Sequence, residues 1–99
     1  PYYYLAGAVG FTTGLANLTL PRSIELHEAG IARDWDRTMA CRDYFEPITG
    51  MRGQLGTPML KAGLEMMGLA GGPVRATGTV LDAAGRRKVR SLLRDRGLL

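Results

Sequence analysis

Few side chains in this sequence have the types and spacing that chemistry requires. Cys41 is its only cysteine and His27 its only histidine, so it contains neither a CxxC motif nor a Cys/His zinc set. Each falls inside a predicted helix, which predicts a packed histidine and a small buried thiol rather than a metal ligand and a nucleophile. The adjacent hydroxyls of Thr12 and Thr13 could hydrogen-bond a carboxylate or a hydroxyl of a ligand, although threonine is also simply a good strand residue.

The two threonines lie in the one run of the sequence that predicts a β-strand, about residues 8–14. Val9 and Phe11 favour a strand, and the glycines in the run permit close backbone approach. A helix follows over about residues 21–32, with Thr19 as a candidate N-cap. A strand followed closely by a helix is half of a β/α unit. Because a lone strand leaves its backbone groups unpaired, the run either joins a larger sheet or is a turn in an all-helical bundle.

Residues 33–99 predict three further helices. Their start signals are the N-cap residues Asp34, Thr57 and Asp82. Pro47 lacks the N–H that a helix interior requires, so it predicts a kink or break. A loop is then predicted before the second of these helices from three glycines, Gly50, Gly53 and Gly56.

The composition is that of a soluble globular protein, with 99 residues of which 45% are hydrophobic. The most apolar stretch, residues 58–70, is interrupted by Lys61 and Glu65, which excludes a membrane-spanning helix. The single cysteine predicts a reducing, cytoplasmic location, and no secretory leader is visible. Since the chain begins at Pro1 rather than at methionine, we expect the tail of a larger protein.

Basic residues dominate the last quarter of the chain and account for most of its net charge of +4. They predict the solvated face of a terminal helix. A nucleic-acid footprint is disfavoured, because no aromatic residue is interleaved to stack on bases. The basic residues are Arg75, Arg86, Arg87, Lys88, Arg90, Arg94 and Arg96.

Several motifs occur in a familiar order and spacing between about Tyr4 and Leu99: Gly10-Phe11-Thr12-Thr13-Gly14-Leu15-Ala16-Asn17, Ala32-Arg33-Asp34, Thr57-Pro58-Met59-Leu60-Lys61, Gly72-Pro73-Val74-Arg75, and Arg94 through Leu99. Together they make the sequence similar to the C-terminal third of the dihydrodipicolinate synthase/N-acetylneuraminate lyase family. The sequence departs from the usual family pattern in three places. Arg33 replaces a glycine, Thr77 replaces a proline, and Thr12-Thr13-Gly14 replaces the more common end of the strand.

The resemblance implies an α/β fold, in which this mostly helical chain is the end of a (β/α)8 TIM barrel. Residues 1–32 would be the last β/α unit, and residues 33–99 a C-terminal extension of three helices. The family consists of class I aldolases and dehydratases, in which a lysine forms a Schiff base with pyruvate or a related 2-keto acid. That lysine and a proton-shuttling tyrosine are expected before Pro1, so no catalytic residue is expected in this chain. The resemblance also implies a homo-oligomer, a dimer or tetramer, and no separate cofactor.

In such a barrel, substrate groups gather at the carboxyl ends of the strands. The resemblance therefore implies a substrate-binding set of Thr12, Thr13, Gly14 and Asn17, in which strand alternation lets only one threonine point inward. Lys61 lies on the appended helices and is expected to be structural, and no metal site is expected. A different interpretation is a free-standing basic helical module that binds nucleic acid or an acidic partner.

Overall fold

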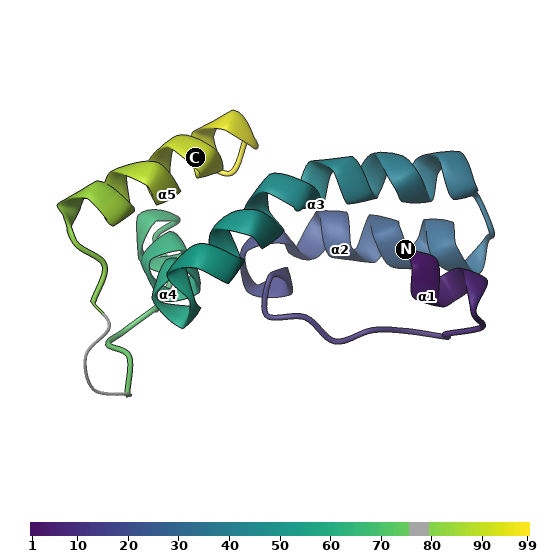
Figure 1. Cartoon of the computed structure of the whole chain (residues 1–99), viewed down its shortest axis with the longest axis horizontal. Helices are drawn as coiled ribbons and strands as arrows, with labels where there is room; N and C mark the ends of the chain where they lie inside the picture. The colour runs from purple at the N-terminus through teal and green to yellow at the C-terminus, as the bar shows by residue number, and fades with distance from the viewer. Residues whose placement is uncertain (76–79) are drawn as a thin grey trace.

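The computed structural model describes residues 1–75 and 80–99, and every regular element in these residues is a helix. Thr77, which stands where the family pattern has a proline, lies outside the described residues. In Figure 1, α2 and α3 lie side by side along the long axis, α1 lies against α2, and α4 and α5 pack around the far end of α3. The helices are α1 (Tyr2–Leu5), α2 (Ala16–Ile31), α3 (Trp35–Leu55), α4 (Thr57–Met66) and α5 (Ala83–Asp95).

The strand predicted for residues 8–14 is not formed. These residues connect α1 to α2 without regular secondary structure and end in a turn at Gly14. Figure 1 shows them as a drawn-out segment that runs beside α2 with no second strand next to it. A strand needs a ladder partner for its backbone N–H and C=O groups, and no described segment supplies one. The prediction of a strand was therefore wrong for this chain, and the all-helical alternative describes its observed elements.

Helix α2 begins earlier than the sequence predicts, at Ala16 instead of about residue 21. Its first turn is separated from the rest by Thr19, whose φ of −131° and ψ of 35° are not helical. The Thr19 hydroxyl donates a hydrogen bond to the Leu15 carbonyl at 2.8 Å. Pro21 follows two residues later, in the first turn of the second part of α2. N–H groups in a first turn have no hydrogen-bond partner within the helix, so a proline is tolerated there. The predicted boundary therefore corresponds to the point where the second, longer part of α2 begins.

The turn from α2 to α3 has a left-handed residue that is not glycine, Arg33, with a φ of 56°. The Arg33 N–H donates to the Gly30 carbonyl at 3.2 Å, and the Asp34 N–H donates to the Ala29 carbonyl at 3.0 Å. This is the Schellman pattern of helix termination, which favours glycine at the left-handed position. Asp34 then caps α3 as predicted, because its carboxylate accepts a hydrogen bond from the Arg37 N–H at 3.1 Å.

Helix α3 runs without a break through Pro47 and through two of the three glycines assigned to a loop, Gly50 and Gly53. Figure 1 shows its axis changing direction partway along. Pro47 is exposed, so water can reach the carbonyl group that its missing N–H leaves without a partner. The neighbouring Ile48 is fully buried in the core and holds this part of the helix in place. Only Gly56, with a φ of 67°, ends the helix.

The remaining two helices begin close to their predicted starts. Gly56, one residue before the predicted Thr57, occupies the N-cap position of α4, and Pro58 lies in its first turn. Asp82 caps α5 as predicted by accepting a hydrogen bond from the Gly85 N–H at 2.6 Å. The core lies where α3, α4 and α5 meet the start of α2, and it consists of Leu18, Ile48, Met59, Leu60, Val89, Leu92 and Leu93.

Candidate functional site

The predicted substrate-binding set lies in the turn that leads from the drawn-out segment into α2, and all four of its residues are exposed. The Thr13 hydroxyl accepts a hydrogen bond from the Leu15 N–H at 3.2 Å. The Asn17 side-chain amide donates to the Gly14 carbonyl at 2.9 Å. These two bonds order the turn, so Thr13 and Asn17 each use part of their hydrogen-bonding capacity within it.

Gly14 lies close to α4, because a Cβ atom added there would be 3.1 Å from Leu60 Cδ1. That spacing is tighter than an ordinary contact between carbon atoms. A glycine therefore lets the turn pack against the core, which is the close approach that the sequence predicted for the glycines of this run.

Two cavities lie beside the drawn-out segment. The larger, of about 410 Å³, has a mostly apolar wall together with two charged side chains from α3, Arg42 and Glu46. The smaller, of about 340 Å³, lies between the segment and α2 and includes His27. Both cavities are lined by Phe11, Thr13 and Ser23, and neither is lined by Thr12. The structure thus separates the two threonines, with Thr13 facing α2 and Thr12 outside both cavities.

Arg42 connects α3 to the N-terminal residues across 40 positions of sequence. Its guanidinium forms an ion pair with the Asp43 carboxylate and donates a hydrogen bond to the Tyr2 hydroxyl at 3.3 Å. These two interactions raise the pKa of Arg42, the Asp43 hydrogen bond contributing most. Sequence reasoning did not predict Tyr2, Ser23 or Arg42 as cavity residues, because their proximity depends on how the helices pack. The only local signal was the spacing of Arg42 and Glu46, which puts them one turn apart on one helix.

His27 is a packed histidine, as the sequence predicted. Its Nδ1 atom is 2.8 Å from the Tyr4 hydroxyl, and the two groups share a hydrogen bond. The Tyr4 ring also meets Phe11 edge-on, with 6.3 Å between the ring centroids. Burial raises the pKa of Tyr4 above its ordinary value. Together these contacts join α1, the drawn-out segment and α2.

Cys41 and Lys61 also have structural environments, as predicted. Cys41 is buried, and burial is the main cause of the increase in its pKa, which disfavours the nucleophilic thiolate. The Lys61 ammonium group donates a hydrogen bond to the Gly71 carbonyl at 2.9 Å and so fastens the connector after α4. Among residues 1–75 and 80–99, no three histidine, cysteine, aspartate or glutamate side chains come together as a metal site would need. No helix in the same residues is long and apolar enough to cross a membrane.

Neither a protein-family model nor a curated protein matches this chain. A solved structure does match it, the dihydrodipicolinate synthase of Oceanobacillus iheyensis, with a TM-score of 0.88 and 27% sequence identity. The alignment covers 100% of this chain. This chain has the fold of part of a dihydrodipicolinate synthase. It spans 34% of the length of that dihydrodipicolinate synthase. The likeness agrees with the resemblance found in the sequence.

Proposed function

We propose that this chain is the C-terminal part of a lyase that forms a Schiff base with pyruvate or a related 2-keto acid. The main support is the likeness to a dihydrodipicolinate synthase, which extends over the whole chain with a TM-score of 0.88. The iminium of a Schiff base withdraws electrons and stabilises a carbanion at the adjacent carbon, which is the chemistry needed to make or break a bond there. The lysine and the tyrosine that do this chemistry belong to the part of the enzyme before Pro1.

Exposed apolar side chains support the proposal that a larger body covers one side of this chain. They follow α1, the drawn-out segment and the outer side of α2, and several are more than half exposed. An apolar surface of this kind marks a face that another protein surface covers. In the proposed enzyme, residues 8–14 would pair with neighbouring strands of the barrel, residues 1–32 would be its last β/α unit, and residues 33–99 its helical extension. The exposed residues are Tyr2, Tyr3, Leu5, Val9, Phe11, Leu20, Ile24 and Ile31.

A trapping experiment on the complete protein tests the mechanism. Pyruvate should form a Schiff base with one lysine, and borohydride should reduce it to a stable adduct. Peptide mass spectrometry would locate that lysine outside residues 1–99. The two lysines of this chain, Lys61 and Lys88, should remain unmodified. An adduct on either of them, or on no lysine at all, would contradict the proposal.

We assign the substrate-binding set to Thr12, Thr13, Gly14 and Asn17, and within it we favour Thr12 as the threonine that reaches the substrate. Thr13 faces α2 and accepts a hydrogen bond from the Leu15 N–H. Alternation along a strand would turn Thr12 to the opposite side, toward the barrel. A hydrogen bond to a charged group is worth about 1.5–3 kcal/mol. In the complete enzyme, Thr12→Val should therefore raise KM by about 10-fold or more, whereas the matched Thr13→Val should change KM little. A larger increase in KM for Thr13→Val than for Thr12→Val would show that Thr13, and not Thr12, binds the substrate.

The cytoplasmic location and the homo-oligomer remain proposals that rest on the same likeness. Sedimentation of the complete protein would measure its oligomeric state directly. The alternative of a free-standing basic module is less well supported, because the likeness to one third of a longer enzyme extends over the whole chain.

A further inference from the structure

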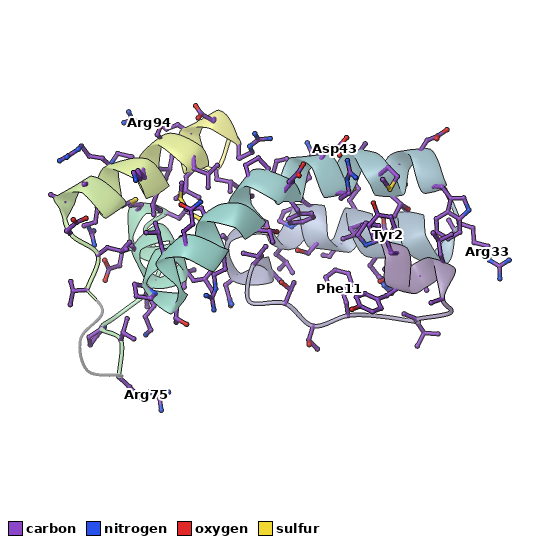
Figure 2. The ribbon with its side chains drawn as sticks, in the orientation of Figure 1. Tyr2, Phe11, Arg33, Asp43, Arg75 and Arg94 are labelled. Atoms are coloured by element: carbon purple, nitrogen blue, oxygen red, sulfur yellow. The ribbon has the colours of Figure 1, made fainter. Side chains whose placement is uncertain are left out.

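Helix α5 presents a row of arginines on the side that faces away from the core. Arg86, Arg90 and Arg94 recur at every fourth residue, so they lie along one line with about 6 Å between neighbours. Arg87 lies next to this row, and all four residues are exposed. Figure 2 shows the Arg94 side chain pointing away from the body of the molecule. We call these four residues the arginine row.

The helix that carries the arginine row is firmly held. On its other side Val89 and Leu93 are fully buried and Leu92 is 8% exposed. The Asp82 carboxylate caps the first turn through its hydrogen bond with the Gly85 N–H. The backbone positions that carry the arginines are therefore fixed before any partner arrives, so binding does not have to order the helix itself.

The charge of the arginine row is largely uncompensated within the described residues. Only Arg86 has a carboxylate partner there, Glu65 on α4, with 3.4 Å between the Arg86 and Glu65 side chains. Like charges four residues apart on a helix destabilise it, and both the 86–90 and 90–94 pairs have this spacing. An acidic partner would remove the repulsion. Arginine suits such a partner, because its planar guanidinium can bind a carboxylate with two hydrogen bonds.

We propose that the arginine row is a docking surface for an acidic helix of a partner protein, one with carboxylates at every fourth position. Two α-helices have the same rise per residue, so three carboxylates on such a partner would face three arginines at matching spacing. A nucleic acid fits less well. Helix α5 has no aromatic side chain on which a base could stack. This docking is independent of the proposed lyase chemistry.

Fluorescence anisotropy with defined probes tests the proposal on the full chain. The first probe is a labelled helical peptide with three glutamates spaced four residues apart. The second has the same composition with its glutamates consecutive, and the third is a short DNA duplex. We expect the first peptide to bind at least about fivefold more tightly than the second, and to weaken as salt is added. Equal binding of the two peptides, or tighter binding of the duplex, would overturn the proposal.

Two charge reversals on α5 make a matched pair of variants. Arg90→Glu changes the centre of the arginine row, whereas Lys88→Glu makes the same change of charge about 160° away around the helix. Both residues are exposed, so both variants should keep the helical circular dichroism of the parent. We expect Arg90→Glu to weaken binding of the first peptide by about tenfold and Lys88→Glu by less than about twofold. Equal losses would show that net charge alone attracts the peptide, and would overturn the proposal. Arg90→Ala should weaken binding less than Arg90→Glu does.

Discussion

Replacing Arg33 with glycine should make this protein more stable. Arg33 occupies the left-handed position between α2 and α3 with a φ of 56°. Its side chain is exposed, and Figure 2 shows it pointing into solvent. The substitution therefore changes the cost of the backbone conformation with little loss of packing. It also introduces the residue that the Schellman pattern favours at the left-handed position.

Two opposing effects set the size of the gain. A residue with a Cβ atom costs about 1–2 kcal/mol in the left-handed conformation. Glycine returns about 0.4–1 kcal/mol of this, because it makes the unfolded chain more flexible. The net increase in the free energy of unfolding should be about 0.5–1 kcal/mol, which corresponds to a rise in Tm of about 2–5 °C for a domain of this size. Arg33→Ala keeps the Cβ atom and should change stability by less than about 0.5 kcal/mol.

Urea unfolding followed by helical circular dichroism would measure the difference. The midpoint should move to higher urea in Arg33→Gly with an unchanged slope, since the surface exposed on unfolding stays the same. The alanine variant separates backbone strain from loss of the arginine charge. If Arg33→Gly were less stable than Arg33→Ala, the left-handed backbone would not be the source of strain.

Three further predictions concern other parts of the chain. Gly30→Ala should lower the free energy of unfolding by about 1–3 kcal/mol, because the added Cβ would lie 2.7 Å from the Tyr4 ring. Gly50→Ala should raise the free energy of unfolding by about 0.5–1 kcal/mol, because no atom lies within 4 Å of the added Cβ. Urea unfolding should therefore show changes of opposite sign for the two variants. In the same assay, Asp82→Ala should lower the free energy of unfolding by about 1 kcal/mol, because it removes the cap of α5. Asp82→Asn keeps a side-chain oxygen that can cap the helix and should lower it much less. Cys41 should react slowly with a thiol reagent at neutral pH and faster as the pH rises, because burial raises its pKa; rapid labelling of the folded protein would contradict its burial.

The features that could be predicted from the sequence are those that depend on a few neighbouring residues. The Asp34 and Asp82 caps are examples, since each joins a carboxylate to an N–H three residues ahead. A kink or break at Pro47 was predicted from the same kind of local rule; α3 bends along its length (Figure 1) but does not break, because the buried Ile48 holds it together. The prediction of a strand over residues 8–14 was wrong for the opposite reason. The preference of these residues for a strand is local, but a strand forms only with a partner segment.

The candidate site shows the same limit. The sequence could mark Thr12 and Thr13 as a pair of hydroxyls, but it could not say which one faces α2. That distinction came from the packing of the drawn-out segment against the helix. The Arg42–Tyr2 hydrogen bond could not have been found from spacing, because the two residues are 40 positions apart.

The position of α3 gives this chain an uneven resistance to local opening. One part of α3 packs on α2, while Ile48 lies in the core with α4 and α5, so this single helix belongs to both regions. Amide hydrogens near Ile48 should therefore exchange with solvent only when most of the structure opens. The helix α1 has only four residues and packs mainly on α2, so its amide hydrogens should exchange much sooner. Heat or denaturant should thus release the N-terminal residues first, and with them the contacts of Tyr4 with His27 and Phe11 that join the drawn-out segment to α2.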